Sequence, residues 1–147
     1  MIENVKIGVI GLGYVGLPVS VLFSTKYQVI GFDINKKRVD SLNKFNDRTL
    51  EISKRKLKNA LRSNLIITNN SSDLKSCNFY IVTVPTPISK NKTPDLRSLK
   101  SASRIVGAQL NKGNIVVYES TVYPGCSEEI CAVSYTHLRA HETEADL

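Results

Sequence analysis

The chain has 147 residues, of which 41% are hydrophobic and 22% charged, and this length and composition predict one ordinary globular domain rather than a collagen-like, coiled-coil or disordered chain. The formal net charge of +7 favours an anionic ligand, but the 20 Lys and Arg residues are scattered without interleaved aromatic residues, so we expect no nucleic-acid partner. The three cysteines lack metal-ligand spacing, which predicts no metal site and a reducing, cytoplasmic location.

A run of nineteen uncharged residues, from Ile7 to Thr25, has the length of a membrane span. Four glycines and Pro18 interrupt this run, and Glu3 and Lys6 precede it. The interruptions favour a strand, a turn and a helix over a membrane span, so we expect no membrane partner.

Short runs of β-branched residues alternate with helical patterns along the chain, which is typical of βαβ units. The expected strands are residues 5–10, 28–32, 65–68, 79–84 and 115–118. The expected helices are residues 14–25, a segment capped by Asn35 that runs to residue 45, a segment capped by Ser53, a segment from Asp95 to Gly113, and a start at Ser127. A turn is expected over residues 69–73. This alternation predicts an α/β fold with a doubly wound parallel sheet.

A G-x-G-x-x-G motif, formed by residues 11–16, lies directly between the first expected strand and the first helix. In such a turn Gly11 permits the tight bend, Gly13 lets the backbone approach a pyrophosphate, and Gly16 lets the helix pack against the strand. The amides at the start of the helix then face the phosphates. The motif therefore predicts the dinucleotide-binding Rossmann form of the fold, with strand order 3-2-1-4-5 and a sixth strand that can be missing.

Asp33 ends the second expected strand, 22 residues after Gly11, where Rossmann folds place the carboxylate that binds the adenosine ribose. Its charge would repel a 2′-phosphate, which favours NAD over NADP. The neighbouring Lys36, Lys37 and Arg38 keep an NADP-linked reductase open, because a cation there can accommodate that phosphate. The alternative without a ligand makes Asp33 a cap of the following helix.

Two polar loops, residues 84–87 and 119–125, leave the carboxyl ends of the fourth and fifth strands, where open α/β sheets bind ligands. Each loop either places a hydroxyl at this crevice or simply ends a strand. We identify no catalytic residue: the chain has no Tyr-x-x-x-Lys pair, and both histidines fall in its last fifteen residues. A helix dipole would stabilise a thiolate at Cys126, but a buried small hydrophobic residue is the more common role.

Four motifs in this order resemble the amino-terminal domain of the UDP-glucose/GDP-mannose dehydrogenase family, over about residues 3 to 132. They are G-L-G-Y-V-G-L-P at residues 11–18, G-F-D-I-N at 31–35, V-P-T-P at 84–87 with P-D-L at 94–96, and E-S-T-V-Y-P-G at 119–125. Residues 46–51 and 118–126 are most similar to the branch that oxidises UDP-N-acetylhexosamines such as UDP-N-acetylglucosamine, as in Vi-type polysaccharide synthesis. A UDP-glucose or UDP-N-acetylmannosamine 6-dehydrogenase is the alternative.

The resemblance implies an enzyme that oxidises the C6 hydroxyl of a UDP-sugar to a carboxylate with two NAD, through a thiohemiacetal and a thioester on a cysteine. It also implies which residues contact the cofactor. Those at the pyrophosphate are Gly11, Gly13, Tyr14, Val15 and Gly16; those at the adenosine ribose are Asp33 and Arg38; those at the nicotinamide are Thr86 and Thr121.

The catalytic cysteine, lysine and aspartate of the family fall beyond position 147, and Cys126 is not that cysteine. From about residue 133 the chain departs from the family pattern, so we expect an NAD-binding domain over residues 1–132 and a non-native tail over residues 133–147. We expect the chain alone to bind NAD weakly and to turn over nothing, since half of the reaction site is absent, and the full-length parent to be a homodimer or larger. The alternative of another class is an NAD(H)-binding module without chemistry.

Overall fold

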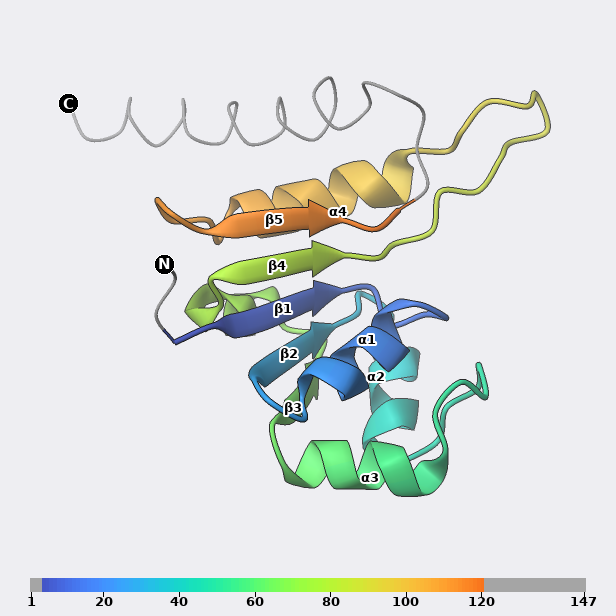
Figure 1. Cartoon of the computed structure of the whole chain (residues 1–147). Helices are drawn as coiled ribbons and strands as arrows, with labels where there is room; N and C mark the ends of the chain where they lie inside the picture. Colours follow the sequence, from blue (N-terminus) through green and yellow to red (C-terminus); the bar gives the residue numbers. More distant parts are fainter. Residues whose placement is uncertain (1–3, 121–147) are drawn as a thin grey trace.

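The computed structural model of the chain describes residues 4–120. Its centre is a five-stranded sheet in the order β3-β2-β1-β4-β5, in which all four neighbouring pairs are parallel (Figure 1). The strands are β1 Lys6–Ile10, β2 Gln28–Phe32, β3 Leu65–Thr68, β4 Phe79–Val82 and β5 Ile115–Tyr118. The predicted doubly wound fold and strand order are confirmed.

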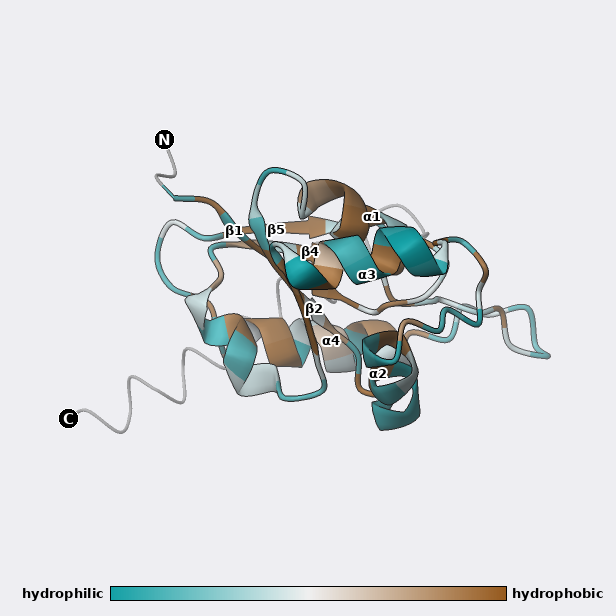
Figure 2. Cartoon of the chain, turned by 90° about the horizontal axis from the view of Figure 1, so that it is seen from below, coloured by the Kyte–Doolittle hydropathy of each residue, from teal (hydrophilic) through white to brown (hydrophobic). Residues whose placement is uncertain are grey.

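Helices cover both faces of the sheet, with α1 and α3 together on one side and α4 on the other (Figure 2). Their bounds are α1 Gly16–Phe23, α2 Lys36–Asn43, α3 Lys54–Arg62 and α4 Arg97–Gly107, with a 3₁₀ helix η1 at Ser71–Ser76. Because both faces are covered, the central strands are apolar on both sides: Val9 of β1 is buried in one core and Ile10 in the other.

Two predicted caps are confirmed. The Asn35 side chain accepts a hydrogen bond from the Arg38 amide at the start of α2, and that of Ser53 accepts one from the Lys56 amide at the start of α3. These caps depend only on residues three positions apart, which explains why the sequence alone could locate them.

Several predicted boundaries are wrong. The first helix begins at Gly16 rather than residue 14, because the glycine turn occupies the preceding residues. The fourth strand ends at Val82 rather than residue 84, and the expected turn at 69–73 is the start of η1. Asp95 does not cap α4: Leu96 is the cap residue, although the Asp95 carboxylate accepts a hydrogen bond from the Arg97 amide (3.1 Å). The same helix ends at Gly107, six residues before Gly113.

Some expectations fall outside residues 4–120, namely the helix start at Ser127, the roles of Thr121 and Cys126, and the tail over residues 133–147. Within residues 4–120, no helix combines the length and the apolar character that a membrane crossing requires. The same part of the chain holds no group of three or more His, Cys, Asp or Glu side chains that could bind a metal ion.

Cys77 is buried in the core that also contains Leu99 of α4, and this burial raises the pKa of its thiol from 9.0 to about 11, although Ser76 and Lys6 act in the opposite direction. Because the folded-state pKa is raised, the stability linked to the neutral thiol is fully present below pH 9 and is lost as the pH rises through about 11. We therefore expect the melting temperature to fall over this range, and to fall less in Cys77→Ala. Thermal denaturation followed by circular dichroism tests this expectation, and equal slopes for the two proteins would contradict it.

Candidate functional site

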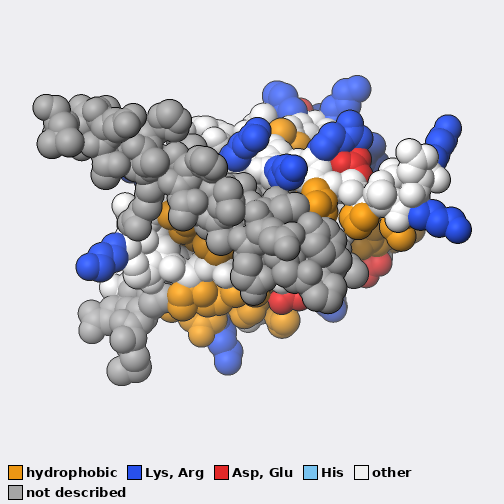
Figure 3. All heavy atoms as spheres, turned by 90° about the horizontal axis from the view of Figure 1, so that it is seen from above, with side chains coloured by type: hydrophobic (Ala, Val, Ile, Leu, Met, Phe, Trp, Pro, Cys, Tyr) orange, Lys and Arg blue, Asp and Glu red, His pale blue; other side chains and the backbone are white. Residues whose placement is uncertain are grey.

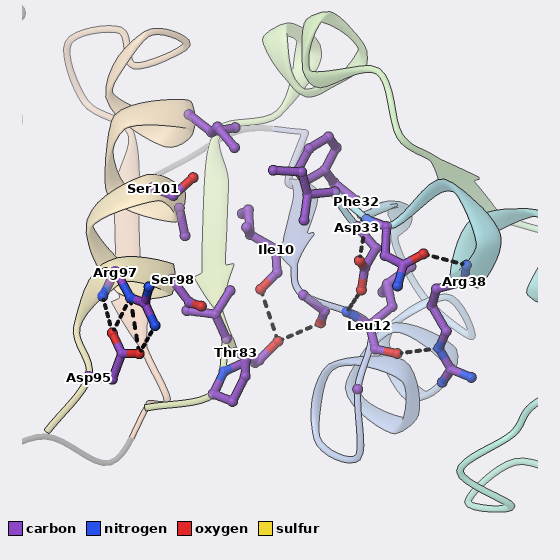
Figure 4. A pocket seen from close by; sticks show the side chains of 18 of the residues that line it. Ile10, Leu12, Phe32, Asp33, Arg38, Thr83, Asp95, Arg97, Ser98 and Ser101 are labelled. Atoms are coloured by element: carbon purple, nitrogen blue, oxygen red, sulfur yellow. Dashed lines mark hydrogen bonds and ion pairs between the residues drawn. The ribbon is translucent and has the colours of Figure 1, made fainter. Parts of the chain in front are cut away.

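A cavity of about 620 Å³ opens at the carboxyl ends of β1, β2 and β4 (Figure 4). Its lining includes the glycine turn after β1, the segment from Asp33 to Arg38 after β2, and Val84 and Pro85 after β4. The chain passes from β1 to β2 on one side and reaches β4 on the other, so the cavity lies where the strand order reverses. Open α/β sheets bind their ligands at this position.

The glycine turn has the conformation for which its residues were predicted. Gly11 has a φ of +96°, which glycine adopts at little cost, and its amide donates to the Phe32 carbonyl (2.8 Å). A Cβ at Gly16 would overlap the Gly11 carbonyl oxygen and the Thr83 hydroxyl, so this residue is buried and fixes how closely α1 packs on the turn. A Cβ at Gly13 would have no protein atom within 4 Å apart from those of Gly13 and its two chain neighbours. The space over Gly13 is therefore open to a ligand.

The start of α1 suits an anion. Its N-cap residue, Val15, makes no side-chain hydrogen bond to the helix, and the first turn contains no acidic residue. The first amides of a helix have no partner within the helix and carry the positive end of its dipole. Tyr14 and Val15 are 69% and 51% exposed beside these amides, so the helix terminus is accessible.

Asp33 lies against the glycine turn. Its Oδ2 accepts a hydrogen bond from the Leu12 amide (2.9 Å) and its Oδ1 accepts one from the Asn35 amide (2.8 Å). The structure thus brings together the carboxylate and the first glycine turn, as the sequence predicted. An ionised carboxylate has about four lone-pair sites, so the Asp33 oxygens keep acceptor capacity for a ligand.

Arg38 reaches the same turn from α2. Its Nε donates to the Leu12 carbonyl (2.9 Å), and its Nη2 forms an ion pair with Asp47 (2.9 Å). The residue is 7% exposed, and within residues 4–120 its Nη1 is a buried nitrogen without a hydrogen-bond partner. A buried donor left unpaired is costly, so this nitrogen is positioned for an acceptor that the chain itself does not supply.

The sequence interpretation missed two residues that build the site. The Thr83 hydroxyl, just after β4, donates to the Gly11 carbonyl (2.7 Å) and lies 3.1 Å from that of Ile10, which ties β4 to the glycine turn. Asp47, in the loop between α2 and α3, holds Arg38. The sequence interpretation named residues 46–51 as part of the resemblance but gave Asp47 no role, although Thr49 two residues later is a spacing typical of side chains that organise a turn.

Thr86 and Thr121 are the two residues predicted to lie at the nicotinamide. Thr86 is half-buried and follows Pro85, which lines the cavity. Thr121 lies outside the described residues, although the preceding Ser120 donates its hydroxyl to the Val84 carbonyl (2.7 Å). This hydrogen bond joins the loops after β4 and β5, as expected if both loops border one crevice.

Two arginines also border the cavity, Arg48 from the loop after α2 and Arg97 from the start of α4. Arg97 forms an ion pair with Asp95 (2.6 Å), and its hydrogen bonds hold the pKa of this carboxyl at about 2. Elsewhere, Lys and Arg side chains stand at several separate places on the surface that Figure 3 shows. Of the two arginines, Arg97 is neutralised by Asp95, so Arg48 is the one that would favour an anionic ligand at the cavity.

Comparison with known proteins agrees with this geometry. The sequence profile described as "UDP-glucose/GDP-mannose dehydrogenase family, NAD binding domain" matches residues 5–147. The chain is 55% identical over 130 residues to a UDP-N-acetyl-D-glucosamine 6-dehydrogenase of Salmonella typhi, and 53% identical over 129 residues to one of Pseudomonas aeruginosa; both matches cover 88% of this chain and 30% of the relative. The solved structure of a UDP-D-ManNAc dehydrogenase from Pyrococcus horikoshii superposes with a TM-score of 0.84 at 35% identity, covering 89% of this chain and 32% of the other. The chain thus spans about 30% of the length of the curated relatives that it matches.

Proposed function

The chain belongs to the UDP-glucose/GDP-mannose dehydrogenase family, of which it matches the NAD-binding domain, and from this premise we propose how its residues hold NAD. The pyrophosphate lies over the glycine turn, and the adenosine ribose lies against Asp33 and Arg38. The nicotinamide extends toward the loops after β4 and β5. The residues of this proposed site are Gly11, Gly13, Tyr14, Val15, Gly16, Asp33, Arg38, Thr86 and Thr121.

Three observations support the fit of NAD to these residues. The space above Gly13 lets phosphate oxygens approach the backbone amides at the start of α1. The Asp33 oxygens retain lone pairs for the two ribose hydroxyls. The Nη1 of Arg38 is buried without a hydrogen-bond partner, and the same side chain donates through Nε to the Leu12 carbonyl of the glycine turn. This Nη1 can therefore donate to the ribose.

Bound NAD supplies a hydride acceptor at its nicotinamide ring. The chain's own residues bind and orient the dinucleotide and contribute no proton transfer that we can assign. Arg38 is engaged by Asp47, and the negative charge of Asp33 would repel a 2′-phosphate, so the site favours NAD over NADP.

For the longer protein of which this sequence forms about 30% of the usual length, we propose a UDP-N-acetylhexosamine 6-dehydrogenase. Its support is the identity of 55% and 53% to two UDP-N-acetyl-D-glucosamine 6-dehydrogenases, against 38% to a UDP-N-acetyl-D-mannosamine dehydrogenase. In this proposal the parent is a cytoplasmic homodimer or larger assembly without a nucleic-acid or membrane partner. The present chain alone binds NAD weakly and has no turnover, because the sugar and the catalytic groups must be held elsewhere.

Gly13→Ala tests the proposed cofactor site. In calorimetric titration we expect the chain to bind NAD and the variant to bind it at least about tenfold more weakly, because the new methyl group stands where the pyrophosphate approaches. The melting temperature of the variant should stay unchanged, since no protein atom beyond the two chain neighbours lies within 4 Å of that methyl group.

Gly113→Ala is the matched control for this titration. Gly113 has a φ of +88° and open space around it, so alanine there strains the backbone without touching the cavity. We expect this variant to melt at a lower temperature and to bind NAD as the unaltered chain does. Equal NAD affinity in the chain and in Gly13→Ala would overturn the proposed site.

A further inference from the structure

Asp47 is saturated by hydrogen bonds within the protein. Its carboxylate accepts from the hydroxyl and the amide of Thr49, from the amides of Glu51 and Ile52, and from Arg38. Burial alone would raise the pKa of this carboxyl, but these hydrogen bonds outweigh it and lower the pKa below 3.8. Asp47 is 6% exposed and has no acceptor capacity left for a ligand.

Arg38 receives its orientation from two sides. The guanidinium is planar and rigid, so fixing its Nε on the Leu12 carbonyl and its Nη2 on Asp47 also fixes the direction of Nη1. Removing Asp47 would leave a buried positive charge without a partner, and the side chain would then move toward water. The position of Arg38 therefore depends on Asp47.

Leu12 is held at both of its backbone polar groups. Its amide donates to Asp33, and its carbonyl accepts from Arg38 (Figure 4). In a trans peptide the N–H points opposite to the C=O of the same unit, and residues 4–120 contain no cis peptide bond. Because the hydrogen bond from Arg38 fixes the direction of the Leu12 carbonyl, the Gly13 N–H points away from Arg38.

We propose that Asp47 is a positioning residue of the cofactor site, which acts through Arg38 on the Leu12–Gly13 peptide and so presets the Gly13 amide for a pyrophosphate. This inference rests on the proposed function. In this proposal Asp47 does not contact the ligand. It sets the geometry of the Arg38 guanidinium and the Gly13 amide, which do. The loop between α2 and α3 thereby becomes part of the cofactor site, although it lies far from the glycine turn in sequence.

A double-mutant cycle on NAD affinity tests this role. Asp47→Asn keeps the size of the side chain but loses its charge, and we expect it to weaken NAD binding about tenfold in calorimetric titration. Arg38→Gln should weaken binding at least as much. If Asp47 acts through Arg38, the double variant binds NAD no more weakly than Arg38→Gln alone. The proposal would be overturned if Asp47→Asn weakened NAD binding as much in the Arg38→Gln background as it does alone. It would also be overturned if Asp47→Asn alone did not weaken NAD binding.

Asp40→Asn is the matched control, since it breaks the exposed ion pair with Lys36 on the same helix. We expect it to leave NAD affinity unchanged. In amide NMR spectra without ligand, Asp47→Asn should shift the Leu12 and Gly13 signals and Asp40→Asn should not, which a purely local role of Asp47 in its own loop would not produce. If Asp47→Asn does not fold, Asp47→Glu takes its place, with a loss of about threefold that disappears in the Arg38→Gln background.

The cycle also separates this inference from the proposed function. Failure of the unaltered chain to bind NAD would remove the proposed function and the inference with it. Binding by the chain together with additive losses in the cycle would overturn the role of Asp47 alone.

Discussion

Gly16→Ala is expected to lower the melting temperature of the chain by about 10 °C or more and to abolish detectable NAD binding. The added methyl group would overlap the Gly11 carbonyl oxygen, which is backbone, and the Thr83 hydroxyl, which is held in place by that same carbonyl. Neither group can yield without opening the turn or moving α1 away from the sheet. Circular dichroism melting and calorimetric titration measure the two effects.

Gly13→Ala is the natural comparison, because it adds the same methyl group three residues earlier in the same turn. There the methyl group meets no protein atom, so stability is retained while NAD binding falls. A melting temperature of Gly16→Ala within about 2 °C of the unaltered chain would show that the turn relaxes around the methyl group, and would contradict the packing role assigned to Gly16.

Most of the fold was predictable because its signals are local. The strands at residues 28–32, 65–68 and 115–118 have the predicted bounds, since each is a short apolar run between turn residues. The boundary that was missed at the end of β4 depends on a tertiary contact. Thr83 continues the apolar run in sequence, but its hydroxyl is committed to the glycine turn 72 residues earlier.

The candidate site was predictable only in part for the same reason. Gly11, Gly13 and Asp33 could be placed together because the glycine spacing and a carboxylate after the second strand are a known mechanical unit. Asp47 could not be placed there, because the spacing of residues 38 and 47 does not indicate that the Arg38 side chain contacts the loop after α2. The proposed cofactor site therefore has one set of residues that the sequence pattern identifies and a supporting set that only the structure shows.

The backbone groups of the glycine turn are divided between contacts within the protein and the proposed ligand. Thr83 donates to the Gly11 carbonyl and Arg38 donates to that of Leu12, while the amides of the same two residues donate to the Phe32 carbonyl and to Asp33. The first amides of α1, which have no partner within the helix, are the donors that remain for a ligand in the proposed site.

Asp33→Ala is expected to weaken NAD binding by about 100-fold, because two charge-assisted hydrogen bonds to ribose hydroxyls are lost, each contributing about 1.5 kcal/mol or more. The variant also leaves the Leu12 amide without its acceptor, so the glycine turn loses one of the hydrogen bonds that hold it. Removing this negative charge lowers the repulsion of a 2′-phosphate, so the preference for NAD over NADP should narrow. Titration of both cofactors at one salt concentration measures both changes.

Asp73→Ala is the control for this variant, since Asp73 accepts a hydrogen bond from Thr68 at the end of the neighbouring strand β3 and does not line the cavity. It should leave the affinity for both cofactors unchanged. If Asp33→Ala binds NAD as well as Asp73→Ala does, the carboxylate serves only to hold the Leu12 and Asn35 amides. The adenosine ribose would then have to lie elsewhere, and the proposed orientation of the dinucleotide would be wrong.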